Sequence, residues 1–267
     1  MNLQNILNEI EKVDVDVIER LDHVSRRGIF SNLLKKAVVG AAPVAFASVL
    51  NKAYGQNNVV AEVLNFALTL EYLEAEFYTR SLATPGLIPG PARPYYEQIT
   101  KHENAHVALL RSALGSAAVS KPTFDFTGRG AFPDVFSNVV TNYAVAQAFE
   151  DTGVRAYKGQ AARLIPFPAV LTTALQIHSV EARHAARIRY LRAQVNGVNQ
   201  KPYITNAESG GLPGAIYSGE ENAMQGGVDV AALVSGMGIS RANVTEAFDE
   251  ILTREQVLAI AAPFIVG

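Results

Sequence analysis

Apolar residues recur every three or four positions along four long segments of the chain, a spacing typical of helices that bury one face. Proline and glycine interrupt this pattern in the loop at 84–91 and in the tight turn at Pro166 and Pro168. A longer polar connection at 116–132 separates the second segment from the third. We therefore predict an all-α four-helix bundle with one long crossover. Its helices are expected at about 59–83, at about 92–114, from just after Asp134 to about 164, and from the proline turn to about 195.

The chain before the bundle, residues 1–56, has two features of its own. Residues 1–24 show helical spacing with an acidic opposite face, and Arg26-Arg27 then precedes an uncharged run at 37–50. This run is too short to cross a bilayer, which needs about 20 residues, but it suits the core of a signal peptide. The arginine pair resembles a twin-arginine export signal, which predicts a periplasmic protein. The alternative is a helical hairpin that stays attached to a cytoplasmic protein.

The chain after the bundle, residues 196–267, is expected to be an irregular tail. Residues 196–244 are rich in glycine and asparagine and are interpreted mainly as surface loop. The last stretch has the pattern of one or two short amphipathic helices, and Thr253 with Gln256 has the spacing of a capping box. The predicted divisions of the chain are thus 1–56, 57–195 and 196–267.

Composition narrows the chemistry that the protein can support. Of its 267 residues, 49% are hydrophobic and 18% are charged, which is typical of a globular protein. The chain has no cysteine, so a metal ion must be held by carboxylates and imidazoles rather than by thiolates. The net charge is −2 and no basic stripe is present, so nucleic acid is not an expected partner.

Two Glu-x-x-His pairs are the first candidate for chemistry. They are Glu103 with His106 and Glu181 with His184. Residues three apart on a helix share one face, with Cβ atoms about 5–6 Å apart, so both side chains of a pair can reach one ion. A single pair is weak support for a metal site, but two pairs on different predicted helices are much stronger.

The pairs belong to an internal repeat. On the preceding predicted helix, each pair is matched by a glutamate that has a tyrosine seven residues later: Glu71 with Tyr78, and Glu150 with Tyr157. The unit Glu-x6-Tyr, loop, Glu-x-x-His is used twice, so we expect two helical hairpins related by an approximate two-fold axis.

The repeat would bring its ionisable residues together in the centre of the bundle. All of them lie in apolar stripes, where bare carboxylates would cost several kcal/mol each to bury. Two divalent cations would neutralise four carboxylates. The predicted metal ligands are Glu71, Glu103, His106, Glu150, Glu181 and His184.

Some neighbouring residues leave alternatives open. Glu74 lies one turn after Glu71 and is an alternative ligand, although only Glu71 has the tyrosine seven residues on. His178 is interpreted either as a hydrogen-bond partner of the site or as an interior histidine satisfied elsewhere. Asp151 and Arg187 are candidates for orienting ligands, and His102 lies outside the stripe and is assigned no role.

Residues 64–78 (LNFALTLEYLEAEFY) and 181–184 (EARH) resemble the ferritin-like di-iron carboxylate superfamily. More narrowly, they are similar to the desiccation-related ferritin-like proteins of bacteria. The resemblance covers about 57–195. It implies that Glu71 and Glu150 are terminal ligands or bridges, that the glutamates of the two Glu-x-x-His pairs bridge or chelate, and that each histidine of the pairs caps one ion. The long flanking regions differ from cage-forming ferritins, so a storage shell is not expected.

These features lead to a hypothesis about function. Oxygen-rich ligation favours two iron ions, or manganese, over copper or zinc. We expect oxidation of Fe(II) with O2 or peroxide in stress protection, with Tyr78 and Tyr157 supplying an electron or a hydrogen bond. The alternatives are a di-manganese catalase-like enzyme, or a non-enzymatic stress-related protein with a structural or vestigial metal site. A homodimer is left open.

Overall fold

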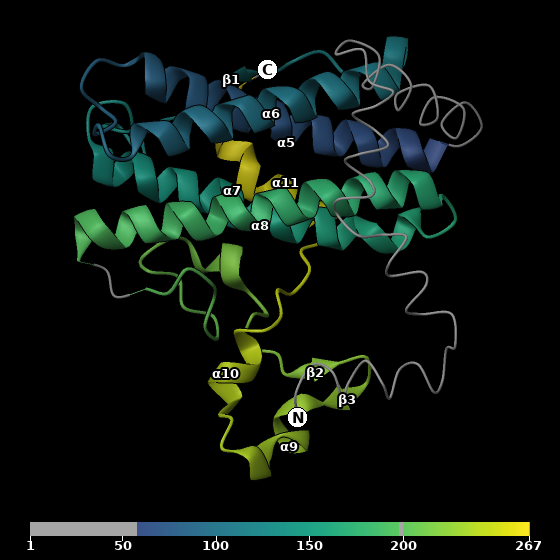
Figure 1. Ribbon diagram of the computed structural model, residues 1–267. Coiled ribbons are helices and arrows are strands. Elements are labelled where there is room, and N and C mark those ends of the chain that lie inside the picture. Colours follow the sequence, from purple (N-terminus) through teal and green to yellow (C-terminus); the bar gives the residue numbers. More distant parts are fainter. Residues whose placement is uncertain (1–57, 198–199, 267) are drawn as a thin grey trace, which may run out of the picture. The chain divides into compact units, whose positions relative to one another are not determined.

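The computed structural model describes residues 58–197 and 200–266 (Figure 1). The predicted N-terminal helix and the predicted twin-arginine signal lie outside the described residues and stay predictions. None of the helices in the described ranges combines the length and the hydropathy that a membrane span requires.

Four long helices form the bundle that the sequence predicts: α5 (Asn58–Ala83), α6 (Arg93–Leu114), α7 (Val139–Leu164) and α8 (Pro168–Asn196). The all-α fold class is thereby confirmed. α5 packs mainly against α6 and α7 mainly against α8, so the bundle consists of two hairpins (Figure 1). The hairpins meet chiefly through α5 and α7, whereas α6 and α8 touch each other only sparingly.

Local chemistry fixes the ends of these helices. Pro94 lies in the first turn of α6, where its fixed φ suits a helix start, and Gly115 ends the helix at φ +55°. α7 begins at Val139, later than predicted. The chain turns between Asp134 and Asn138 first, and the Asn138 side chain then caps the helix by accepting from the backbone N–H of Val140.

The crossover contains a strand that the sequence does not predict. β1 (Thr123–Phe124) pairs antiparallel with β4 (Ile265–Val266), at the far end of the chain. Beside this pair, Phe264 packs edge-on against Phe149 of α7, with ring centroids 4.9 Å apart. The C-terminus is therefore tied both to the crossover and to the bundle.

The tail contains more structure than a surface loop. It holds a two-stranded hairpin and several short helices, and the predicted capping box at Thr253 and Gln256 is confirmed at the start of the last α-helix. In chain order these elements are η2 (Gly214–Tyr217), β2 (Met224–Gln225), β3 (Val228–Asp229), α9 (Val230–Leu233), η3 (Ser235–Met237), α10 (Arg241–Thr245), α11 (Arg254–Ala261) and η4 (Ala262–Phe264).

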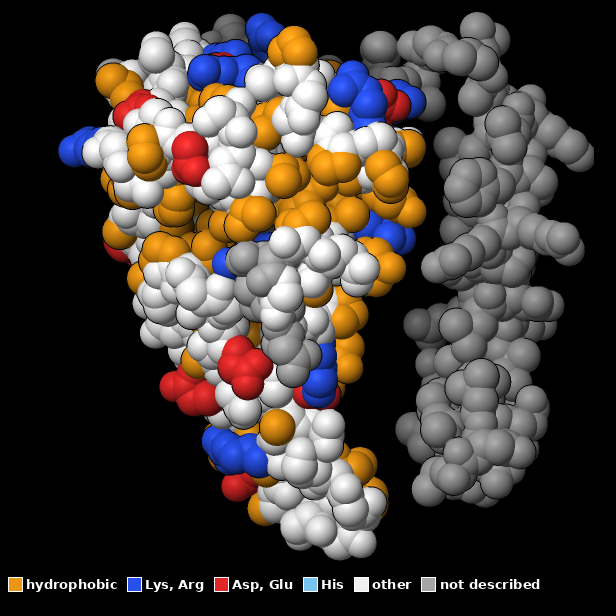
Figure 2. Space-filling view, turned by 90° about the vertical axis from the view of Figure 1, so that its left-hand side faces the viewer, with side chains coloured by type: hydrophobic (Ala, Val, Ile, Leu, Met, Phe, Trp, Pro, Cys, Tyr) orange, Lys and Arg blue, Asp and Glu red, His pale blue; other side chains and the backbone are white. Residues whose placement is uncertain are grey.

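The tail and the crossover border an apolar groove of about 480 Å³ on α7. Hydrophobic side chains gather in the hollowed band across the face shown in Figure 2. The groove is lined by residues of the crossover, of α7, of the segment around η2, and of α11 with η4; Phe132, Phe149, Ile216, Ile260 and Phe264 are the largest of them.

Gly159 allows the tail to approach α7 closely. A Cβ atom at this position would lie 2.1 Å from the backbone oxygen of Leu252, far inside van der Waals contact. Glycine costs about 1 kcal/mol in a helix interior relative to alanine, and the close approach explains its presence here. We expect Gly159→Ala to lower the free energy of unfolding by about 1–3 kcal/mol, as overpacking does. Denaturant titration measures the change. Gly90→Ala is the control because the space around Gly90 is open, and an equal response of both variants would contradict this expectation.

Candidate metal centre

Two groups of buried acidic and histidine side chains meet in the middle of the bundle. Within each group, one potential ligand atom per residue lies within 4.8 Å of all the others. Each hairpin contributes one lone glutamate and one Glu-x-x-His pair, as the repeat predicts. The first group is Glu71, Glu103, His106 and Glu181, and the second is Glu103, Glu150, Glu181 and His184. Glu103 and Glu181 therefore belong to both groups.

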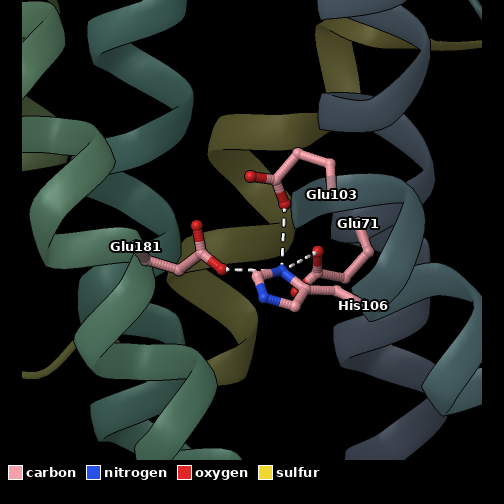
Figure 3. Close-up of side chains that lie close together, drawn as sticks. All are labelled: Glu71, Glu103, His106 and Glu181. Atoms are coloured by element: carbon pink, nitrogen blue, oxygen red, sulfur yellow. Dashed lines mark hydrogen bonds and ion pairs between the residues drawn. The ribbon is translucent and has the colours of Figure 1, made fainter. Parts of the chain in front are cut away.

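His106 is the centre of the first group. Its Nδ1 lies 3.1 Å from a carboxylate oxygen of each of Glu71, Glu103 and Glu181 (Figure 3). These oxygens come from α5, α6 and α8 and approach the ring from different sides. A single N–H group cannot point at three hydrogen-bond acceptors at once. One cation, in contrast, can be coordinated by several carboxylate oxygens and a ring nitrogen.

His184 has the matching arrangement in the second group. Its Nδ1 lies 2.8 Å from Oε1 of Glu103, 3.1 Å from Oε2 of Glu181 and 3.5 Å from Oε2 of Glu150. The two histidines thus present the same ring nitrogen to the same pair of shared glutamates. Each also faces one glutamate of its own, which is Glu150 here.

The two tyrosines of the repeat cross between the hairpins. Tyr78 donates a hydrogen bond to Oε1 of Glu150, and Tyr157 donates one to Oε1 of Glu71. Each hairpin therefore fixes the unshared glutamate of the other, which is the reciprocal pattern that an approximate two-fold axis requires. Burial raises the pKa of both tyrosines well above the ordinary value, so both hydroxyl groups stay protonated and remain donors.

The donor set fits a pair of divalent cations. The side chains of all four glutamates of the two groups are fully buried. Oε1 of Glu103, Oε2 of Glu150 and Oε1 of Glu181 each face a histidine Nδ1 that other carboxylates also approach, and no well-directed hydrogen bond from the described residues reaches these oxygens. Buried carboxylates that must share so few donors are costly unless a cation compensates them, and two divalent ions carry the charge that balances four carboxylates.

Residues 60–194 match the sequence model of the family described as a ferritin-like domain. The chain belongs to the ferritin-like domain family. The match extends over nearly the whole of the four bundle helices and includes all six residues of the two groups. No curated protein gives a significant match.

Electrostatics in this ferritin-like domain couple metal binding to protons. Burial by itself lowers the pKa of His106 and His184, but the carboxylates around each ring outweigh it, and both pKa values end well above the ordinary value. Burial raises the pKa of Glu150 to about 7, although His184 opposes the rise. Metals bind the deprotonated forms of these groups, so an entering ion must displace protons.

Glu74 lies beside the ferritin-like centre but in neither group. It is buried on α5, one turn after Glu71, and its counterpart in the repeat is Gly153. A Cβ on Gly153 would lie 3.2 Å from Oε1 of Glu74, so glycine makes room for this carboxyl group. Burial first, and then the charge of Glu150, raise the pKa of Glu74 well above the ordinary value. Of the two alternatives on α5, the geometry thus places Glu71 within the ligand groups.

Two histidines outside the six have distinct environments. His178 is half-buried and donates through Nδ1 to the backbone oxygen of Val154 at 3.0 Å, which favours the interpretation as a histidine satisfied elsewhere. His102, which sequence reasoning left without a role, lies with Nδ1 2.8 Å from Nε2 of His184. Burial and the neighbouring His184 lower the pKa of His102. In the sequence, its position one helical turn before a predicted ligand is only a weak indication of this contact.

The structure gives Asp151 and Arg187 partners outside the six residues. Asp151 pairs with Arg189, with an N–O distance of 2.7 Å, and accepts a hydrogen bond from Tyr217 at 2.6 Å. The guanidinium carbon of Arg187 lies 4.1 Å from the ring centre of Tyr95, on the α6–α8 side. Asp151 therefore connects α7 to α8 and to the tail, and Arg187 connects α8 to α6, while an orienting role for either residue stays a prediction.

Proposed function

We propose that this ferritin-like protein binds two iron ions and oxidises Fe(II) with O2 or peroxide. The observation that carries the proposal is that two groups, each of three carboxylates and one imidazole, share Glu103 and Glu181. Shared carboxylates would hold two ions side by side, and each ion would keep one histidine of its own.

The choice of iron follows from the chemistry of the donors. Two imidazole nitrogens and four carboxylate groups form an oxygen-rich set, which suits iron or manganese better than copper or zinc. Iron, when bound, supplies the electrons that reduce O2 or peroxide.

The chain's own residues would prepare the site for this chemistry. Tyr78 and Tyr157 hold one oxygen of each unshared glutamate and so aim the other oxygen inward. The surrounding apolar core limits the access of water. A rigid, dry site holds the ligands in place before the ions arrive.

The cellular role that we propose is stress protection. It is supported by the resemblance of residues 64–78 and 181–184 to desiccation-related ferritin-like proteins. Removal of Fe(II) together with peroxide would serve such a role, because the two react to give damaging products when they are free in solution.

Metal analysis followed by an oxygen assay tests the proposal. After reconstitution with Fe(II) in air, we expect about two iron ions per chain. Addition of further Fe(II) should then consume O2 faster than the same Fe(II) does without protein. Less than about 0.2 ion per chain after metal-replete expression would contradict the metal centre itself.

Other outcomes would contradict the iron oxidase in particular. Two manganese ions together with disproportionation of hydrogen peroxide would identify a catalase-like enzyme. Two bound ions without redox activity, whose removal lowers the thermal midpoint, would identify a structural site, because a ligand that binds only the folded state stabilises it.

A further inference from the structure

His102 and His184 form a directly bonded pair at the edge of the metal centre. His102 is partly buried on α6, next to the shared ligand Glu103. Nδ1 of His102 lies 2.8 Å from Nε2 of His184. The rings are within 14° of parallel and their centroids are 5.1 Å apart, which corresponds to rings joined edge to edge by an N–H···N bond rather than stacked face to face.

The direction of this hydrogen bond follows from the metal centre. Nδ1 of His184 faces the carboxylates, so it is the nitrogen that would bind an ion. Nε2 of His184 then keeps its proton and donates to Nδ1 of His102. His102 in turn carries its proton on Nε2, which lies 2.6 Å from the position of Nε2 in the side-chain amide of Gln98. This direction requires the Gln98 amide to be rotated by 180° from the orientation in the structure, so that its oxygen rather than its nitrogen faces Nε2 of His102.

The first group has no equivalent of this pair. Among the described residues, no hydrogen bond reaches Nε2 of His106. The repeat explains the difference, because Glu103 corresponds to Glu181 and position 102 therefore corresponds to Val180. Valine has no polar side-chain atom. The two halves of the bundle place the same types of ligand in the centre. They differ in whether a side chain forms a hydrogen bond with Nε2 of the ligating histidine.

We propose that His102 is a positioning residue that makes the metal position at His184 bind its ion more tightly than the position at His106. The proposal rests on the metal binding proposed above, but not on any redox activity. A hydrogen-bonded partner fixes the tautomer and the ring orientation of a ligating histidine and increases its basicity. Removal of such a partner typically weakens metal binding by about 10–100-fold.

Three variants separate positioning from general packing. His102→Leu removes the acceptor. Val180→Leu is the matched control, since it places the same residue at the corresponding position of the other half. His102→Asn keeps an acceptor, because its side-chain oxygen is as many bonds from the backbone as Nδ1 of histidine. Metal-free full-length protein is titrated with Co(II), followed by absorption and calorimetry, to obtain the two stepwise binding constants.

We expect wild-type protein to bind two Co(II) ions with unequal constants. His102→Leu should weaken the tighter step by about 10–100-fold and leave the other nearly unchanged. Val180→Leu should change neither step appreciably, and His102→Asn should recover most of the loss. Circular dichroism of each metal-free variant reports whether the fold is retained.

The contrary results are equally specific. Equal weakening of both steps by His102→Leu, no weakening at all, or failure of His102→Asn to rescue would overturn the positioning role. Wild-type protein that binds two Co(II) ions but does not oxidise Fe(II) would contradict the proposed function. The role of His102 would then still be decided by the stepwise Co(II) binding constants of the variants. Wild-type protein that binds no metal would overturn both.

Discussion

The double substitution Glu103→Gln with Glu181→Gln is expected to abolish binding of both metal ions. These two glutamates are shared by the two groups, so their loss leaves each group with one carboxylate and one histidine. Neutral amides retain the shape of the side chains but remove two of the four negative charges. We expect occupancy to fall from about two ions per chain to less than about 0.2, since ligand charge and number set the affinity. Elemental analysis after reconstitution measures the effect.

The metal-free double variant should nevertheless keep the fold of the wild-type protein. The variant loses the ion pairs of these two glutamates with His106 and His184. The amides nevertheless keep the shape of the side chains and can still form hydrogen bonds, and a buried amide costs less than a buried charge. Glu97→Gln is the matched control, because Glu97 lies exposed on the same helix as Glu103. Retention of two ions by the double variant, or loss of ions by Glu97→Gln, would place the metals elsewhere.

The residues of the candidate metal centre could be predicted from the sequence because their pattern occurs twice in the chain. Glu71 and Glu150 each have a tyrosine two turns later, and each precedes a Glu-x-x-His pair on the next helix. Helical periodicity alone places these residues in inward stripes. The structure adds something that periodicity does not contain: each tyrosine reaches the glutamate of the other hairpin.

Contacts between distant segments account for what could not be predicted. β1 and β4 are two-residue strands separated in the sequence by α7, α8 and the tail, and such short segments carry no alternating pattern. His102 lies outside the apolar stripe and meets His184 because these two side chains bridge α6 and α8, which local pattern does not place relative to each other. The late start of α7 depends on the cap at Asn138. The hydrophobic pattern of a sequence defines the ends of a helix less well than its interior.

The tail was the least predictable region for the same reason. Its glycine- and asparagine-rich sequence indicates loop, yet the segment around Ser218 and the segment around Glu250 both dock on α7. The docking residue is Arg155, which is fully buried. A buried arginine in the middle of a long helix is not expected from periodicity, since arginine is almost never buried unless it is paired.

Arg155 is expected to be the most important single residue for stability in the tail interface. Its guanidinium group forms an ion pair with Glu220 at 2.7 Å and donates to the backbone oxygens of Ile216, Ser218 and Glu250. Arg155→Met keeps most of the volume of the side chain but leaves Glu220 buried without its cation. Breaking a buried ion pair in this way typically costs about 3–5 kcal/mol. We expect the free energy of unfolding of metal-free protein to fall by that amount in denaturant titrations.

Two further variants show whether the loss comes from the buried charge. Arg163→Met makes the same change on the same helix, but Arg163 pairs with the exposed Glu62, and an exposed pair contributes only about 0–1 kcal/mol. Adding Glu220→Gln to Arg155→Met should restore part of the stability, because it removes the unpaired carboxylate while the unsatisfied carbonyl groups remain. The chain around 216–252 should also become sensitive to proteases in Arg155→Met, since its anchor to α7 is lost. If Arg155→Met were no less stable than Arg163→Met, the tail would be held by its apolar contacts and by the β1–β4 pair instead.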